Sequence, residues 1–291
     1  KILKTTYKRL SKKQQEEDNN SATGGGEENN NNNVDETTVV DGVTNIFEPC
    51  WTSDSNKALL ETARKLTEQA RTHHETMTGE YQKRVLLYSG WGKKLLKQAG
   101  FGPEVVSMAM QLASYRLLGK QIGTYEAALA RRFYHGRTDT ARPVSPQSSA
   151  FVEVMGRKPY KGDEENKLYW LQEAAMVHQE VQDLANSGLG VDRHLFGLGM
   201  MVQDDDPHVP ALFSDPLYLR SKPLRLSTSL VPFTPGFGPV ADDGIGVGFT
   251  VAADSCVFTI TSRKENNYVE PFYNLLEEAL EEIGDLIRPG Y

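Results

Sequence analysis

Residues 245–261 read IGVGFTVAADSCVFTIT and contain two runs rich in β-branched and aromatic residues, Ile245 to Val251 and Cys256 to Thr261. Such runs are typical of β-strands. Shortly before them, residues 224–227 alternate between apolar and polar side chains, which is the period of two of a half-buried strand. We therefore expect a β-sheet whose strands include these three segments.

The segments on both sides of these strands have the apolar periodicity of helices. One helix is expected after the capping residues 53–55, one between Pro103 and Gly119, one from about 164 to 185, and one from Val269 to Ile287. The apolar stripe of the first is Leu59, Ala63, Leu66 and Ala70, and the inward residues of the third are Leu171, Ala174, Val177, Val181 and Leu184. This order of helices, then strands, then a closing helix predicts an α/β fold, a mixed β-sheet covered by helices.

The first part of the chain differs in composition from the rest. Residues 11–38 pass from polar residues into Gly24 to Gly26 and then a run from Asn29 to Asn33. Such a stretch has too little apolar surface to offset the entropy cost of ordering it. Residues 1–46 are therefore interpreted as a disordered insertion or linker, and residues 47–291 as one folded domain.

Composition excludes several function classes. The net charge of −7 argues against a general nucleic-acid binder, and no apolar run approaches the roughly 18 residues that a membrane-spanning helix needs. The two cysteines, Cys50 and Cys256, can form neither a disulfide framework nor a zinc site. We expect an intracellular protein with no membrane segment in this chain, no nucleic-acid partner and no metal.

A pair of lysines is the first candidate site. Lys93 and Lys97 are four residues apart and share one face if the segment is helical, so together they can hold a phosphate group. A solvated basic surface is the alternative, and for a lysine pair taken alone the residues favour that interpretation over a phosphate site.

Hydroxyl groups and one arginine form the next candidates. Tyr125 lies in a Thr-Tyr-Glu motif and Thr138 in Gly-Arg-Thr-Asp-Thr, where the hydroxyls can orient a small polar ligand. Arg193, in Asp-Arg-His-Leu, has a planar guanidinium suited to a carboxylate. The alternatives are an Arg137/Asp139 pair in a turn and an Asp192/Arg193 pair, and both remain open.

Two serines complete the set. Ser227 and Ser229 are spaced two apart on a predicted strand, so both side chains project to one face and can donate toward a single oxygen atom. No GxSxG motif surrounds them, which disfavours a serine nucleophile. The glycine-rich residues 243–248 lack the strand–GxGxxG–helix context of dinucleotide binding.

Taken in order, the motifs around Lys93, Thr124–Glu126, Gly136–Thr140, Asp192–Leu198, Ser227–Ser229 and Phe237–Gly244 resemble the carnitine/choline acyltransferase family over about residues 48–291. The stretch FGPVADDGIGV is most similar to the carnitine palmitoyltransferase branch. The resemblance implies the C-terminal half of a two-domain coenzyme-A-dependent acyltransferase fold. It also implies acyl transfer between coenzyme A, as co-substrate, and the hydroxyl of carnitine, with no permanently bound cofactor.

The resemblance assigns a role to each candidate. Tyr125, Thr138 and Arg193 would hold the carnitine carboxylate, with Ser227 assisting, and Phe237 would flank the trimethylammonium group. Ser229 would stabilise the oxyanion. On the coenzyme A side, Lys93 and Lys97 would contact the 3′-phosphate, with Glu104 near the adenine end.

Choline acetyltransferases carry valine at the position of Thr138 and asparagine at that of Arg193, so both residues favour carnitine. Departures from the family pattern at Ala127, Leu129, Pro143 and Leu230 put parts of the ligand pocket in doubt. A glycine, Gly236, shortly before Phe237 favours medium or long acyl chains.

The histidine of an HxxxDG motif, which is the general base in this family, is absent from the 291 residues. The sequence is therefore expected to be part of an enzyme, inactive without an N-terminal half that would be its partner. The alternative is a non-catalytic coenzyme A or carnitine-binding module or degenerate subunit. A mitochondrial location is expected, with peroxisomal or cytoplasmic locations as alternatives.

Overall fold

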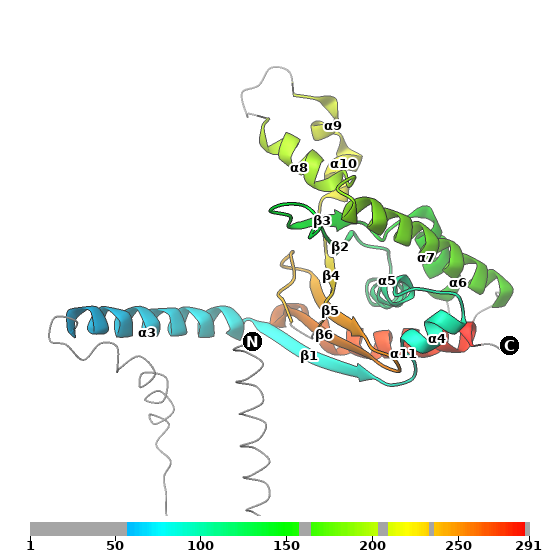
Figure 1. Ribbon diagram of the computed structural model, residues 1–291, viewed down its shortest axis with the longest axis horizontal. Coiled ribbons are helices and arrows are strands. Elements are labelled where there is room, and N and C mark those ends of the chain that lie inside the picture. Colours follow the sequence, from blue (N-terminus) through cyan, green and yellow to red (C-terminus); the bar gives the residue numbers. More distant parts are fainter. Residues whose placement is uncertain (1–56, 157–163, 203–208, 233–235, 289–291) are drawn as a thin grey trace, which may run out of the picture. The chain divides into compact units, whose positions relative to one another are not determined.

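A computed structural model describes residues 57–156, 164–202, 209–232 and 236–288 (Figure 1). The chain divides into two units, residues 1–70 and 71–291. Helix α3 (Lys57–Gly79) crosses this division, and every side chain described in it is exposed, so its expected apolar stripe is not buried; Leu66, for example, is 59% exposed. The predicted boundary near residue 46 lies outside the described residues and stays a prediction.

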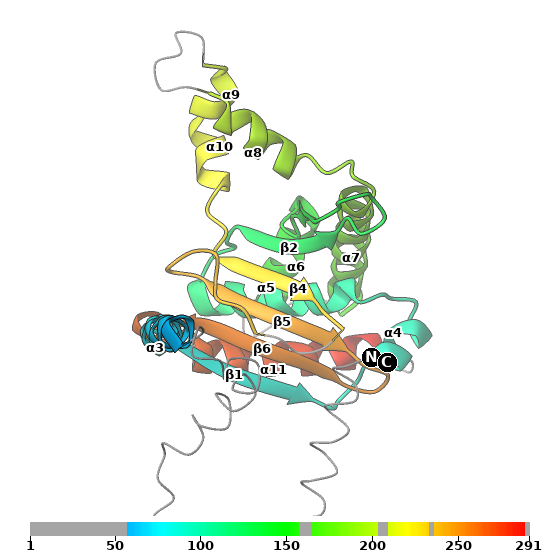
Figure 2. The ribbon, with the colours of Figure 1, turned by 60° about the vertical axis from the view of Figure 1, so that its left-hand side comes forward.

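The second unit is built on a six-stranded sheet in the order β1-β6-β5-β4-β2-β3. Figure 2 shows the strands from β2 to β1 side by side, with α5 and α11 behind them. Strands β2, β4 and β5 run parallel and the other neighbours antiparallel, so the sheet is mixed, as the sequence predicted. The strands are β1 (Tyr81–Tyr88), β2 (Thr124–Leu129), β3 (Thr138–Ala141), β4 (Leu226–Leu230), β5 (Ile245–Val251) and β6 (Cys256–Arg263).

One face of the sheet carries the hydrophobic core. Alternate residues of the central strands, among them Val247, Phe249 and Phe258, are buried against α5 (Glu104–Leu118) and α11 (Val269–Ile287). Both helices match their predicted bounds. Helix α5 ends at Gly119, whose positive φ of 68° suits a residue without a Cβ.

The remaining helices lie around this core or connect its strands. Helix α7 (Glu164–Asn186) packs on α6 and against β2 and β3, whereas α8 lies beside β3. The other bounds are α4 (Lys93–Gln98), α6 (Pro146–Gly156), α8 (Asp192–Met200), α9 (Ala211–Ser214), α10 (Pro216–Ser221) and the 3₁₀ helix η3 (Lys264–Asn266).

Two expectations are wrong in detail. The order of elements is not helices followed by strands, because β1, β2 and β3 alternate with the early helices. In α7 the expected core residue Leu184 is 50% exposed, and Ala185 and His178 are buried instead. The buried face of α7 therefore includes a histidine, at a position where the apolar pattern predicted none.

Candidate functional site

The sheet face opposite the core helices carries small and hydroxyl-bearing side chains. Tyr125 on β2 pairs in register with Ser227 on β4, and Ser229 pairs with Gly248 on β5. Because side chains alternate between the two faces, Tyr125, Ser227 and Ser229 project to the same side. Leu129 pairs with Thr138, so Thr138 also belongs to this face. Four predicted site residues thus share one sheet face.

A cavity of about 700 Å³ opens beside this face at the β3 edge. Tyr125 lines it from β2, and Arg193 lines it from α8, so the structure brings these two predicted ligands of one carboxylate to the same cavity. The other lining residues are Thr140, Arg142, Asp192, Leu195, Phe196, Gly199, Met200, Tyr218, Ser221, Lys222, Leu224 and Val240. Thr138, Ser227, Ser229 and Phe237 are not among them. The cavity therefore unites only part of the predicted set.

An ion pair fixes the start of α8, and with it Arg193. Arg142 donates from Nε to Asp192 Oδ1 at 2.8 Å, and from a terminal nitrogen to the Ser221 carbonyl oxygen at 2.6 Å. Asp192 is held by Arg142, so the alternative Asp192/Arg193 pair does not form among the described residues. Arg193 is exposed, so its guanidinium can reach a ligand.

The segment around Phe237 lies against the same sheet face. The Phe237 carbonyl oxygen accepts a hydrogen bond from the Thr261 hydroxyl on β6. A Cβ on Gly246 of β5 would lie only 2.8 Å from that carbonyl oxygen, so glycine allows this close approach. Phe237 is half-buried and lies across β5 from the two serines.

Ser227 and Ser229 differ in their surroundings. Ser227 is fully buried, and its hydroxyl donates to the Ile245 carbonyl oxygen at 3.3 Å. Ser229 is half-buried near the end of β4, which leaves it the more accessible of the two. This difference fits a structural or orienting position for Ser227 and an outward one for Ser229.

The predicted coenzyme A residues form two separate groups. Lys93 and Lys97 are exposed on α4, so they share one helix face as expected. The start of α4 is tied to the β5–β6 turn, because Lys93 N–H donates to the Ala252 carbonyl oxygen at 2.8 Å. Glu104 begins α5, where burial raises its pKa above the ordinary value of a glutamic acid.

A buried polar cluster lies behind Tyr125, on the helix side of the sheet. The carboxylate of Glu126 accepts hydrogen bonds from Ser107 at 2.6 Å and from Thr228 at 3.4 Å, and His178 Nε2 lies 3.3 Å away. Burial alone raises the pKa of Glu126, but the charge of His178 and the hydrogen bonds from His178, Ser107 and Thr228 outweigh it, so this pKa lies below its usual value. The sequence interpretation missed this cluster because its members come from four elements.

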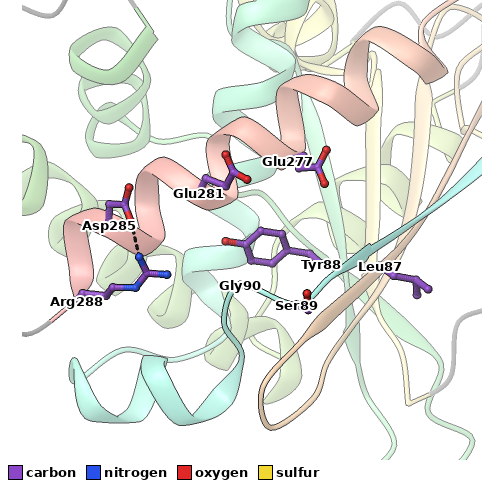
Figure 3. A pocket seen from close by; sticks show the side chains of 8 residues that line it. All are labelled: Leu87, Tyr88, Ser89, Gly90, Glu277, Glu281, Asp285 and Arg288. Carbon is purple, nitrogen blue, oxygen red and sulfur yellow. Dashed lines mark hydrogen bonds and ion pairs between the residues drawn. The ribbon is translucent and has the colours of Figure 1, made fainter.

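A second cavity, of about 430 Å³, lies between the end of β1 and α11 (Figure 3). Glu277, Glu281 and Asp285 line it at intervals of four along α11, and Arg288 pairs with Asp285 at 2.5 Å. Burial raises the pKa of Tyr88, which also lines it, to about 12. An acidic lining repels phosphate groups, so this cavity is unsuited to coenzyme A.

Within the described ranges, no cluster of His, Cys, Asp and Glu side chains has the arrangement of a metal site. In the same part of the chain, none of the helices combines the length and apolar character required to span a bilayer.

Comparison with known proteins gives the family. Residues 54–278 match the family described as choline/carnitine O-acyltransferase. The mitochondrial carnitine O-acetyltransferase of Saccharomyces cerevisiae is 33% identical over 77% of this chain and 34% of its own length. The human muscle isoform of carnitine O-palmitoyltransferase 1 is 37% identical over 68% of this chain and 28% of its own length.

Among solved structures, the condensation domain of the enacyloxin polyketide synthase covers 72% of this chain and 42% of its own, with 9% identity and a TM-score of 0.40. This likeness is too low to carry an argument.

The chain belongs to the choline/carnitine O-acyltransferase family. Its mixed sheet and the hydroxyl-lined sheet face are consistent with this membership. The chain spans about a third of the length of the two relatives described above. Identities of 33% and 37% connect it to both acetyl- and palmitoyltransferases, so membership alone leaves the acyl chain open.

Proposed function

We propose that this chain is the carnitine-binding part of a carnitine O-acyltransferase, which transfers an acyl group between coenzyme A and the carnitine hydroxyl. The observation that supports it best is that Tyr125 and Arg193 line one cavity. A phenol and a guanidinium are suited to bind one carboxylate, which carnitine has and choline lacks. The Arg142–Asp192 pair orients the start of α8 and so supports Arg193.

The rest of the sheet face would bind the reacting end of carnitine. Thr138 and Ser227 would add hydroxyl contacts, and Phe237 would present its ring to the trimethylammonium group, an attraction worth roughly 0.5–2 kcal/mol. Support comes from strand register, because Tyr125 and Ser227 are direct partners and Thr138 projects to the same face.

Ser229 would act on the tetrahedral intermediate. When the carnitine oxygen attacks the thioester carbonyl, the carbonyl oxygen becomes an oxyanion, and a hydroxyl donor aimed at it lowers the barrier. The C–S bond then breaks, the coenzyme A sulfur leaves, and acylcarnitine is released. The half-buried position of Ser229 leaves its hydroxyl free to donate in this way. The proton of the carnitine hydroxyl needs a general base, which in this proposal is a histidine outside this sequence.

Coenzyme A would approach along α4 and the start of α5. The exposed Lys93 and Lys97 would pair with its 3′-phosphate, and Glu104 would accept hydrogen bonds near the adenine end. The mitochondrial name of the yeast relative supports a mitochondrial location for the whole protein.

A second candidate is a coenzyme A or carnitine-binding module without activity. It is favoured by Leu129 and Leu230, which depart from the family pattern. Both leucines are partly exposed.

The test is coenzyme A release from a series of acyl-CoA thioesters, with and without carnitine, by the native full-length protein that contains this sequence. We expect release that depends on carnitine, and the series gives the preferred chain length. Bound coenzyme A without release would contradict the enzyme proposal and support the binding module.

A Lys93→Ala variant should raise the KM for acyl-CoA and leave the KM for carnitine within about twofold, because it removes only a phosphate partner.

A further inference from the structure

The buried cluster behind Tyr125 has no part in the proposed function, although it lies one residue from the carnitine site. Glu126 follows Tyr125 on β2 and projects to the opposite face, where it is only 5% exposed. Thr228 lies between Ser227 and Ser229 on β4 and projects the same way. The cluster and the site are therefore the two sides of the same strand pair.

The hydrogen bonds of the cluster cross from β2 to β4. The Thr228 hydroxyl lies 3.4 Å from Glu126 Oε2, and it also donates to the Tyr125 carbonyl oxygen at 3.1 Å. Ser107 contributes from α5 and His178 from α7. The carboxylate of Glu126 is thus the point at which two helices and two strands meet.

Because Glu126 is buried, the stability of its charged form depends on its hydrogen-bond and ion-pair partners. A buried carboxylate is costly unless it is paired and hydrogen-bonded. Among the described residues, His178 is the one basic side chain within ion-pair distance of Glu126. Glu104 interacts electrostatically with both His178 and Glu126, and it is acidic, so it cannot replace His178 as a partner of Glu126.

A buried histidine at position 178 lowers the stability of the fold. It is 2% exposed, and its Nδ1 atom has no hydrogen-bond partner within the described part of the chain. A buried polar atom without a partner costs stability that an apolar side chain of similar size would not cost. Core packing therefore does not explain the residue, whereas its contact with Glu126 does.

We propose that His178 is a positioning residue, which acts through Glu126 to set the relative position of β2 and β4 and thereby of Tyr125, Ser227 and Ser229. This inference rests on the proposed function. In it, His178 holds Glu126 in the orientation that receives Thr228, and the strand pair keeps the register in which Tyr125 lies beside Ser227. His178 touches no substrate.

The test replaces His178, in the full-length protein, by one of two residues with a side-chain amide, glutamine or asparagine. In His178→Gln, the side-chain nitrogen reaches the place of Nε2 and keeps a donor toward Glu126. In His178→Asn, it reaches only the place of Nδ1 and loses that donor. We expect His178→Asn to raise the KM for carnitine about fivefold, and His178→Gln to return it to within about twofold of the wild type. The matched control is His74→Asn, on the exposed surface of α3, which should leave the KM for carnitine at its wild-type value.

A role in packing alone predicts a different result. It would lower the melting temperature of both variants and leave the KM for carnitine equal in the two, and that result would overturn the inference. If His178→Asn does not fold, Glu126→Leu, whose side chain has no acceptor for His178 or Thr228, should raise the KM for carnitine to a similar extent. An unchanged KM in Glu126→Leu would overturn the inference as well. A wild type that releases no coenzyme A with carnitine refutes the proposed function first, and the two failures are thereby distinguished.

Discussion

At the scale of single residues, the candidate site depends on strand register. Tyr125 and Glu126 are neighbours in sequence, yet one faces the cavity and the other the helix layer. A slip of one residue would exchange them, which would place a carboxylate beside the proposed carboxylate-binding site and a tyrosine in the core. The buried hydrogen bonds of Glu126 oppose that slip.

The sequence motifs include Tyr125, Ser227 and Ser229, whose roles stay predictions, but they contain no sign of His178. His178 and Glu126 are 52 residues apart, and neither lies in a spacing that links them. Helical periodicity even favoured Leu184 for the buried face of α7. Only tertiary packing, which rotates α7 so that His178 and Ala185 face inward, brings the pair together.

Cys256 offers a test of the core at this scale. Burial raises the pKa of its thiol to about 12. At pH 8 the reactive thiolate is then about 10⁻⁴ of the thiol, against about a third for an unperturbed cysteine of pKa about 8.5. We expect little iodoacetamide labelling of Cys256 in the native protein, measured by mass spectrometry of the peptide that contains it.

The same peptide in urea provides the control, because unfolding removes the burial and should lead to full labelling. Equal rates of labelling with and without urea would show that Cys256 is exposed. Because the pKa of Cys256 is raised on folding, the free energy of unfolding depends on its ionisation. The contribution of Cys256 to stability is complete below about pH 8.5 and is lost as the pH rises toward 12.

At the scale of elements, the helices were easier to predict than the strands. Helix α11 has one continuous apolar face, and α5 has Pro103 before it and Gly119 after it, so both bounds follow from local chemistry. Strand β1 has Lys83 and Arg84 in its middle and buries only Leu86 and Tyr88. An edge strand with one buried end has no clear period of two, and β1 was missed for this reason.

The packing of α11 gives a quantitative prediction. Leu276 is fully buried against the sheet, and Leu276→Ala should lower the free energy of unfolding by about 2–5 kcal/mol, since it removes apolar contacts and leaves a cavity. Urea denaturation measures this change. The matched control is Leu217→Ala in α10, where the leucine is 72% exposed and the expected change is within about 0.5 kcal/mol. Equal effects of the two substitutions would contradict the described core.

At the scale of the whole molecule, the fold and the family followed from the sequence, but the arrangement of the site did not. The ordered motifs implied the family that the comparison confirms, and the mixed sheet has the predicted class. The pairing of β2 with β4, which are distant in sequence, and the position of α8 determine which motif residues lie together. The cavity joins Tyr125 with Arg193 but not with Thr138, and no local spacing indicated this division.

The central claim is that the cavity of Tyr125 and Arg193 selects a substrate with a carboxylate. Its most direct test is the ratio of kcat/KM for carnitine to kcat/KM for choline, measured in the full-length protein and in its Arg193→Asn variant. Loss of a charge-assisted hydrogen bond should lower kcat/KM for carnitine by about 10- to 100-fold and leave the value for choline unchanged or raised. An unchanged ratio would mean that Arg193 does not bind the substrate carboxylate, and the proposed site would be wrong.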